Sequence, residues 1–277
     1  AEPGDHILLM PGAYPVRGTS IKITRAGRAD APIFLRAPKF GDVTLELNML
    51  EGLHVRAPYW VFENLVIRGN CKSDRHCEHA FHVVGGAHST VIRNVMALNF
   101  NAAIKVNRLR DAIPDFGLIE DSFLANEWPR HTVRPVTPID IVAASGWRVT
   151  SNVIADFAKA KGNGISYAAF FKGGGAGGVF DRNLVLCEWQ HYGGVRLGLS
   201  IGGGGTYAAS ACRNGDCSKE HEGAVIRNNI IMNCPNDVGL YINKAPNTLV
   251  HNNILMGTAG VDVRYEESYV TLHNNIV

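Results

Sequence analysis

Three stretches near the end of the chain decide its fold: VIRNNIIMNC (225–234), LVHNNILMG (249–257) and TLHNNIV (271–277). Each has a short apolar run, then a pair of Asn residues, then a second short apolar run. Runs of this length without a helical period are typical of β-strands. Looser copies lie upstream, at VFENLVIRGN (61–70), VIRNVMALNF (91–100), LIEDSFLANE (118–127), VTSNVIADF (149–157) and VFDRNLVLC (179–187).

The spacing of these copies indicates a solenoid. Their aligned corner positions are 64, 94, 121, 152, 182, 228, 252 and 274, so the successive steps are 30, 27, 31, 30, 46, 24 and 22 residues. A unit this small cannot bury its own inner face, whereas stacked units share one core. Asn tolerates the left-handed backbone of a sharp corner, and stacked Asn side chains can hydrogen-bond between rungs. We predict an all-β fold, a single-domain right-handed parallel β-helix over residues 1–277; a sandwich or barrel is the alternative.

Composition narrows the functional classes. The 277 residues include 27 Lys+Arg and 25 Asp+Glu, a net charge of +2, and 46% are hydrophobic. This apolar content excludes intrinsic disorder. The balanced charge gives no general attraction to nucleic acid or membrane, and no apolar stretch is long enough to span a bilayer. We therefore expect neither kind of partner. Because the chain stops within a repeat, at residue 277, the sequence leaves open whether further rungs follow.

The six cysteines include two closely spaced pairs, CKSDRHC (71–77) and CRNGDC (212–217), with Cys187 and Cys234 remaining. Six cysteines allow fifteen pairings, so sequence alone does not fix the connectivity. Free thiols and a metal site are the alternatives, although the spacings differ from those of zinc knuckles. Local disulfides are favoured, and they imply an oxidising compartment, so we expect a secreted or periplasmic protein.

One step in the repeat, of 46 residues, is far longer than the others and places a long loop insertion around 198–223. A glycine-rich stretch, KGNGISYAAFFKGGGAGG (161–178), precedes it. Insertions in solenoids cluster on one face, often the binding face. Glycines let a sugar ring approach the backbone. The insertion therefore predicts a carbohydrate-binding face; flexible loops without a role are the alternative.

Strand alternation suggests which polar side chains decorate that face. In the short strands PIDIV, GVRLG, GLYIN and GVDVRY the apolar residues are expected to point inward and the residues between them outward. Rungs lie about 4.8 Å apart, so the outward residues should form a column about 20 Å long, the length of about four sugar units. The column consists of Asp140, Lys172, Arg196, Tyr241 and Arg264, and Asn243 is expected to point outward near Tyr241 and to contact substrate.

Two further groups are expected to flank the column and to contact substrate. The first lies in the loop stretch NEWPRHTVRP and the second just before the long insertion. They contain Arg130, His131 and Arg134 on one side, and Trp189, His191 and Tyr192 on the other.

The opening phrase PGDHILLMPGAY (3–14) resembles the first rung of the pectate-lyase-like β-helix superfamily. The following IKITRAGRADAPIFLRA (21–37) and the Asn-Asn corners resemble its chondroitinase-B and alginate-lyase branch. The resemblance implies a polysaccharide lyase that cleaves a uronate-containing acidic polysaccharide, of alginate or glycosaminoglycan type, by β-elimination. That branch uses a Lys base and an Arg one rung later, an order and spacing that Lys172 and Arg196 resemble. Tyr241 and His191 are the alternates for these catalytic roles.

The sequence departs from that branch where a calcium site would be. The resemblance implies an Asn and two Glu just before the Lys, but the stretch here is NGISYAAFFK (163–172), without a carboxylate. A calcium ion needs several oxygen ligands, and Asn163 with backbone carbonyls is a thin set. Calcium is therefore doubtful here, and no cofactor is firmly implied.

Three other functions stay open on the sequence. A uronate C5-epimerase shares the proton abstraction but returns a proton to the opposite face. A glycoside hydrolase needs two carboxylates around the bond, and the column lacks such a pair. A non-catalytic glycan-binding solenoid needs only the face.

Overall fold

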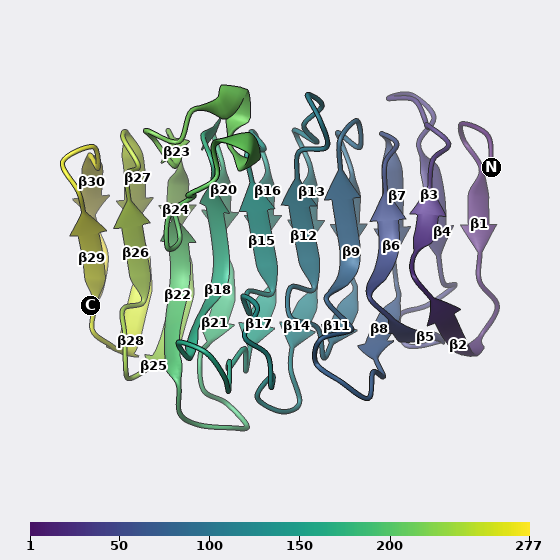
Figure 1. Cartoon of the computed structure of the whole chain (residues 1–277), viewed down its shortest axis with the longest axis horizontal. Helices are drawn as coiled ribbons and strands as arrows, with labels where there is room; N and C mark the ends of the chain where they lie inside the picture. Colours follow the sequence, from purple (N-terminus) through teal and green to yellow (C-terminus); the bar gives the residue numbers. More distant parts are fainter.

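The computed structural model describes all 277 residues as a right-handed parallel β-helix, which confirms the predicted fold. The chain coils through three long sheets of parallel strands, with the rungs stacked side by side from residue 1 to residue 277 (Figure 1). Only two short 3-10 turns, η1 (Ala209–Ala211) and η2 (Arg213–Gly215), are helical. No helix has the length and hydrophobicity to span a bilayer.

Each coil contributes one strand to each sheet. Sheet A consists of β1 (His6–Leu8), β4 (Ile33–Arg36), β7 (Trp60–Glu63), β10 (Val91–Arg93), β13 (Leu118–Glu120), β16 (Arg148–Thr150), β20 (Val179–Asp181), β24 (Val225–Arg227), β27 (Thr248–His251) and β30 (Val270–His273). Sheet B consists of β2 (Gly12–Gly18), β5 (Val43–Met49), β8 (Val66–Gly69), β11 (Met96–Leu98), β14 (Phe123–Ala125), β17 (Val153–Ala155), β21 (Leu184–Leu186), β25 (Ile230–Cys234) and β28 (Ile254–Thr258). Sheet C consists of β3 (Ile21–Ile23), β6 (Glu51–Val55), β9 (His79–Val84), β12 (Ile104–Asn107), β15 (Ile139–Val142), β18 (Ile165–Lys172), β22 (Val195–Ile201), β26 (Leu240–Asn243) and β29 (Val261–Arg264). A small fourth sheet pairs β19 (Gly175–Ala176) with β23 (His221–Glu222).

One hydrophobic core fills the coil. Apolar side chains in register stack along it, as Ile104, Ile139 and Ala169 do on consecutive strands of sheet C. Phe62, Phe81 and many other core side chains are completely buried. The apolar runs noted in the sequence are thus the inward faces of strands, and polar residues between them face outward.

The corner between sheets A and B has the predicted asparagines, in two adjacent roles. Seven of the eight aligned positions, among them Asn64, Asn94 and Asn228, have a positive φ, and in the remaining rung Ser151 takes the place of position 152. From the rung of Ser151 onward, the residue that directly follows the positive-φ corner residue is an Asn whose side chain points inward. These side chains form a ladder of amide hydrogen bonds of 2.9–3.0 Å between rungs. The ladder consists of Asn152, Asn183, Asn229, Asn253 and Asn275.

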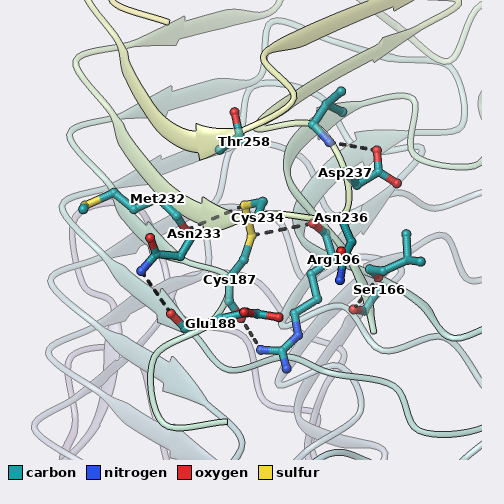
Figure 2. Close-up of a disulfide and its surroundings, with 12 residues drawn as sticks. Ser166, Cys187, Glu188, Arg196, Met232, Asn233, Cys234, Asn236, Asp237 and Thr258 are labelled. Carbon is teal, nitrogen blue, oxygen red and sulfur yellow. Dashed lines mark hydrogen bonds between the residues drawn. A yellow bond between two sulfur atoms is a disulfide. The ribbon is translucent and has the colours of Figure 1, made fainter. Parts of the chain in front are cut away.

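All six cysteines are paired, as Cys71–Cys77, Cys187–Cys234 and Cys212–Cys217. The two local disulfides that the sequence favours are therefore present. Cys187–Cys234 joins residues that follow β21 and end β25, on neighbouring rungs of sheet B (Figure 2). The alternatives of free thiols and cysteine-bound metal are excluded by these pairings.

The long insertion follows β22. It covers residues 202–220, includes η1 and η2, and rises at the end of the sheet C strands, at the top of Figure 1. We call this side, where the sheet C strands end, the upper edge, and the side where they begin the lower edge.

Candidate functional site

A cleft of about 610 Å³ lies between the outer face of sheet C and the insertion loop. Its floor comes from strands β9, β12, β15 and β18 and its roof from the loop. The floor residues are His79, His82, Lys105, Asn107, Arg108, Val142 and Lys172, and the roof residues are Gly205, Thr206, Tyr207, Ala208, Ser210 and Ala211.

The buried carboxylate of Glu220 holds the roof in place. It accepts hydrogen bonds from the Thr206 hydroxyl at 2.7 Å and from the backbone N–H of Gly173 at 2.9 Å. Gly202 starts the loop with φ +102° and passes so close to Asn243 that a Cβ would lie 2.1 Å from its carbonyl oxygen, so this position requires glycine. The loop is therefore a fixed wall of the cleft.

Two further contacts tie the other end of the loop to the coil. Arg108 donates to the carbonyl oxygen of Cys212 at 2.6 Å, and Arg213 donates to that of Ala143 at 2.9 Å. Cys212 is itself bonded to Cys217. These contacts join the loop to rungs far away in the sequence.

Lys172 ends β18 and brings its amine into the cleft. The amine lies 4.6 Å from the centroid of the Phe170 ring and 3.5 Å from the carbonyl oxygen of Gly205, and it has no ion-pair partner. Burial lowers the pKa of Lys172; the carboxylates of Asp140 and Glu220 oppose this shift, while the charge of Lys105 adds to it. A lysine in this setting holds a neutral, basic amine closer to neutral pH than an exposed lysine does.

Other cations share the cleft. Lys105 lies on β12 and forms a 2.7 Å ion pair with Asp140, its neighbour in register on β15. Arg108 follows β12, and its side chain is about four-fifths buried. An anionic group entering the cleft therefore meets positive charge that is only partly neutralised.

The predicted column is present in part. Asp140 and Tyr241 face outward in one row, in register with Phe170 and Ser200. Lys172 lies in the next row, two residues further along the strands, level with Asn243 and Arg264 on later rungs. Tyr241 accepts a hydrogen bond from Arg264 at 3.2 Å.

A smaller pocket of about 170 Å³ lies on the other side of the loop and shares Gly205, Thr206 and Tyr207 with the main cleft. Asn243 lines it, together with Lys244 and other residues. Five of the predicted residues, Asp140, Lys172, Tyr241, Asn243 and Arg264, thus lie on one face.

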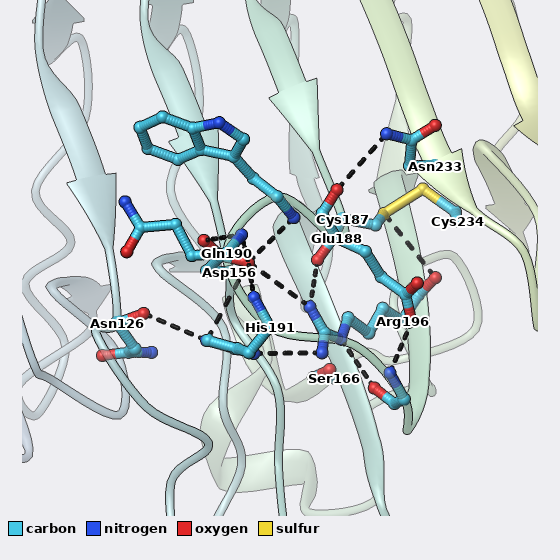
Figure 3. A network of polar contacts seen from close by, with 12 residues as sticks. Asn126, Asp156, Ser166, Cys187, Glu188, Gln190, His191, Arg196, Asn233 and Cys234 are labelled. Atoms are coloured by element: carbon cyan, nitrogen blue, oxygen red, sulfur yellow. Dashed lines mark hydrogen bonds and ion pairs between the residues drawn. A yellow bond between two sulfur atoms is a disulfide. The ribbon is translucent and has the colours of Figure 1, made fainter.

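The expected outward position of Arg196 is wrong. The residue is 2% exposed, and its guanidinium lies inside the protein, where it donates to the carbonyl oxygens of Cys187 and Gly193. It also lies 3.1 Å from Nδ1 of His191 and 3.7 Å from Asp156 (Figure 3). This network uses up the guanidinium inside the protein, so Arg196 is not available to a substrate on the outer face.

The error has a physical cause in the strand. Leu199 and Ile201 do point into the core, but Leu197 packs outside, against Val238 and Tyr241. The inward-outward alternation is therefore interrupted at Gly198, where the ladder with β18 has a gap between the Tyr167–Leu197 and Ala169–Leu199 pairs although the register stays the same. The inward positions expected for the apolar residues Val195 and Leu197 are wrong: both pack on the outer face, so Arg196 between them points inward.

Lys172 and Arg196 are also at opposite edges of sheet C. Arg196 is in register with Ser166, so Lys172 lies six residues further along the strand direction, or roughly 20 Å. The predicted catalytic pair of Lys172 and Arg196 does not exist. The 24 residues between them were interpreted as one rung, whereas the rung here is the 30 residues from Ser166 to Arg196.

The second predicted flank lies at this lower edge too. His191 lies 3.1 Å from the carbonyl oxygen of Asn126 and joins the Arg196 network. Trp189 contacts Phe123 edge-on, and Tyr192 is 77% exposed. Their predicted place beside the column is wrong, because the turn that carries them leaves the coil at the lower edge.

The first flank does not reach the cleft either. Arg130 is buried and pairs with Asp74 at 2.9 Å, which makes it part of the scaffold. His131 and Arg134 line a separate pocket of about 310 Å³, and Arg134 pairs with Glu78 at 3.0 Å. None of the three lines the Lys172 cleft.

Sequence reasoning missed much of the cleft, including His79, His82, Arg108 and Tyr207. One signal was available: Lys105 alternates outward in AIKVN, and His82 occupies the same place in AFHVV one rung earlier. The loop residues had no such signal, because a loop has no alternation to follow.

The residues before Lys172 do not fit calcium. Oδ1 of Asn163, the one candidate ligand there, accepts hydrogen bonds from Lys159 and from the backbone N–H of Ile165. The outer face of β18 between Asn163 and Lys172 carries the aromatic rings of Tyr167 and Phe170. The stretch before Lys172 therefore provides no calcium site.

Comparisons with known proteins agree with this fold. No protein-family model matches the chain. Pectate lyase L of Dickeya chrysanthemi is 23% identical over 120 residues, which are 39% of this chain and 27% of that protein. The matched region is thus about a quarter of the length of that relative.

Three solved structures superpose on nearly the whole chain. An alginate lyase of Paenibacillus sp. str. FPU-7 has a TM-score of 0.53 at 15% identity, covering 99% of this chain and 93% of its own. The alginate lyase AlyF-OU02 in complex with G6 has a TM-score of 0.62 at 14% identity, covering 99% and 54%. Pectate lyase Pel9A has a TM-score of 0.52 at 12% identity, covering 99% and 72%. At these identities the likeness establishes the parallel β-helix fold that the opening phrase and the corner repeats predicted.

Proposed function

We propose that this protein is a polysaccharide lyase that cleaves a uronate-containing acidic polysaccharide by β-elimination, with Lys172 as the base. The observation that carries the proposal is the Lys172 amine: it is largely buried, has no carboxylate partner and faces a cleft of about 610 Å³ that contains further cations. The alginate and pectate lyases with the same fold support the substrate class.

β-Elimination needs a base, a proton donor for the leaving oxygen, and positive charge near the uronate carboxylate. The neutral Lys172 amine takes the proton from the carbon next to the uronate carboxylate. The electron pair left behind forms a carbon–carbon double bond as the bond to the glycosidic oxygen breaks, and that oxygen takes up a proton from the new Lys172 ammonium. A base is most effective when its pKa lies near the working pH, and burial moves the Lys172 pKa in that direction.

Charge on the uronate must be neutralised for the carbon acid to ionise, since the transition state is an enolate. Arg196 cannot do this, and we assign the task to Lys105 and Arg108, which share the cleft with Lys172. Lys105 is two rungs from Lys172, roughly 10 Å along the coil axis, and its amine reaches Asp140 on the strand between them.

Substrate-binding roles extend from the cleft along the same face. We assign Asp140, Tyr241, Asn243 and Arg264 to this surface, Asp140 acting through the Lys105 ion pair. Tyr207 adds a ring that is 95% exposed at the rim shared by the two pockets, where a sugar can stack on it.

Activity on defined polymers tests the proposal. The full chain is incubated with polymannuronate, polyguluronate, pectate and glycosaminoglycans, and the far-ultraviolet absorbance of the unsaturated product is followed. We expect absorbance to rise with at least one uronate polymer, with Lys172→Met inactive and the exposed-loop control Lys161→Met unchanged. A folded protein that leaves every polymer intact contradicts the proposal, and deuterium uptake without chain shortening assigns the site to an epimerase instead.

Three disulfides and the absence of free cysteine support a secreted or periplasmic location, since disulfides persist in oxidising compartments. An extracellular polymer as substrate agrees with this location. Fractionation of the source cells, with thiol alkylation before lysis, tests this location. The protein is expected outside the cytoplasm, with none of its six cysteines alkylated because all are in disulfides.

A further inference from the structure

A cluster of histidines and one glutamate lies at the end of the cleft farthest from the C-terminus. Glu51 and His54 are on β6, and His79 and His82 are on the next strand, β9. One ligand-capable atom each from Glu51, His79 and His82 lies within 4.8 Å of the others. The elimination proposed above uses none of these groups.

The hydrogen bonds around His82 determine which of its nitrogens is protonated. Asn107 donates its amide N–H to the carbonyl oxygen of Arg108 at 2.8 Å, so its amide oxygen faces Nε2 of His82, also at 2.8 Å. Nε2 must therefore carry the proton and donate it. Nδ1 is left with a lone pair, is buried, and has no hydrogen-bond partner.

That lone pair faces another acceptor. Nδ1 of His82 lies 3.0 Å from a carboxylate oxygen of Glu51. Two acceptors this close repel each other unless a positive charge lies between them. The arrangement therefore requires a proton or a metal ion at this point.

His79 brings a third acceptor. Its Nδ1 lies 3.0 Å from the carbonyl oxygen of Ala102 and donates to it, which leaves Nε2 with the free lone pair. This is the arrangement of metal-binding histidines, whose other ring nitrogen donates to a backbone carbonyl. A proton satisfies only two of the three acceptors, whereas a metal ion satisfies all of them.

His54 keeps the glutamate in place. Arg56 donates to Nε2 of His54 at 3.4 Å, so Nδ1 of His54 carries a proton and faces the second oxygen of Glu51 at 3.3 Å. His54 is thus a positioning residue, and the first oxygen of Glu51 is left for the site.

We propose that Glu51, His79 and His82 form a binding site for a divalent transition-metal ion of the zinc class. Imidazole nitrogens with one carboxylate are ligands that zinc prefers, whereas calcium requires oxygens. Zinc–nitrogen bonds are about 2.0–2.1 Å long, so ligands on a tetrahedral zinc lie roughly 3.3 Å apart. The observed 3.0 Å between Glu51 and His82 is close to this, and small side-chain rotations bring His79 in.

The fourth position of the ion faces the cleft, because His79 and His82 both line it. A water or a carboxylate can occupy that position. If the proposed lyase function holds, the carboxylate is that of a uronate bound beside Lys105.

Metal binding is measured without substrate. The full chain is freed of metal with a chelator and titrated with Zn²⁺ by calorimetry and with Co²⁺ by visible absorption. We expect one equivalent of either ion, with the intense absorption bands of four-coordinate Co²⁺. Glu51→Gln and His82→Ala are each expected to weaken binding at least about 100-fold, and His54→Ala about 10-fold.

The control is a second pair of histidines. His251 and His273 lie on adjacent rungs of sheet A with ring centroids 5.5 Å apart, but without a carboxylate between them. His251→Ala should bind Zn²⁺ as the unmodified chain does. If a variant fails to fold, anomalous diffraction at the zinc edge from crystals of the unmodified chain locates the ion directly.

Two results overturn the proposal: no binding by the metal-free chain, or binding that survives both ligand substitutions. If the metal-free chain keeps full lyase activity and still binds one zinc ion when zinc is supplied, the metal site is supported and its contact with the substrate is rejected. Zinc binding without lyase activity leaves the site and rejects the proposed function.

Discussion

The upper and lower edges of sheet C both carry buried ionisable groups, but they use them differently. At the lower edge, Arg196 and Asp156 are surrounded by partners: the carboxylate of Asp156 accepts the backbone N–H groups of Trp189 and Gln190, and Arg196 is bound to backbone carbonyls (Figure 3). At the upper edge, Lys172 is largely buried without an ion-pair partner.

The difference shows how a scaffold charge can be distinguished from a functional one. A buried charge costs several kcal/mol unless protein groups satisfy it. At the lower edge, backbone groups and the opposite charge satisfy both Arg196 and Asp156, and these contacts hold the turn 187–195 in place. At the upper edge the amine of Lys172 has no ion-pair partner and lies beside an open cleft, which is typical of a functional group that interacts with a substrate.

The largest expected effects come from removing one cation at each edge. Lys172→Met should lower kcat roughly 1,000-fold, since a general base contributes 100- to 10,000-fold, while stability stays the same or rises slightly because a desolvated cation is lost. Arg196→Met should reduce the free energy of unfolding by about 3 kcal/mol, because Asp156 and two carbonyls lose their partner. Steady-state kinetics and urea unfolding measure the two effects.

Lys172→Arg serves as the control for charge, because it keeps the cation but not a neutral base. It should be as inactive as Lys172→Met. An Arg196→Met protein of unchanged stability but lost kcat would falsify the assignment of the lower edge to the scaffold.

The disulfides sharpen the comparison in stability. Cys187–Cys234 closes 47 residues at the lower edge, and Cys212–Cys217 closes 5 in the upper loop. By loop-closure entropy, replacing the first pair by alanines should cost about 4 kcal/mol and the second about 2 kcal/mol. Replacing the second pair should also raise KM, since the loop roofs the cleft. Equal losses of stability, with no change in KM, contradict a loop that shapes the site.

Acid should act on the upper edge through His221. This residue starts β23 just after the insertion, is completely buried, and accepts the backbone N–H of Gly178 at 2.9 Å. Burial lowers the pKa of His221 from 6.5 to about 3. Between these values the unfolded chain binds a proton that the folded chain does not, so stability falls as the pH drops through this window, by up to about 1.4 kcal/mol per pH unit.

His221→Gln keeps an acceptor for Gly178 but cannot be protonated there. Its free energy of unfolding should therefore depend less steeply on pH between about 6 and 4 than that of the unmodified chain. Urea unfolding at several pH values provides the slopes. Identical slopes reject a neutral buried imidazole at this position.

The smallest effect compares two exposed tyrosines. Tyr207 is 95% exposed at the rim of the cleft and Tyr192 is 77% exposed at the lower edge. Stacking of a ring is worth about 1 kcal/mol, so Tyr207→Ala should raise KM roughly 5-fold with little change in kcat. Tyr192→Ala should change neither. A larger effect of Tyr192→Ala places the substrate at the lower edge.

Much of the fold could be predicted from local signals. Asn64, Asn94 and Asn228 mark corners because their short polar side chains tolerate the left-handed backbone at low cost. Alternation gave Asp140 the correct side, since β15 is a regular strand in register with β12. At Arg196 the same rule failed, because the irregularity at Gly198 leaves no clear mark in the sequence.

Repeats and short apolar runs in the sequence were enough to determine the coil, its corners and the strand that carries Lys172, because these depend on the conformational preferences of neighbouring residues. Only the tertiary structure decided that Arg196 is buried, that the loop 202–220 roofs Lys172, and that Glu51 meets His82 of the neighbouring rung. These contacts depend on which residues of successive coils come into register. That register depends on rung lengths and strand irregularities spread over many residues.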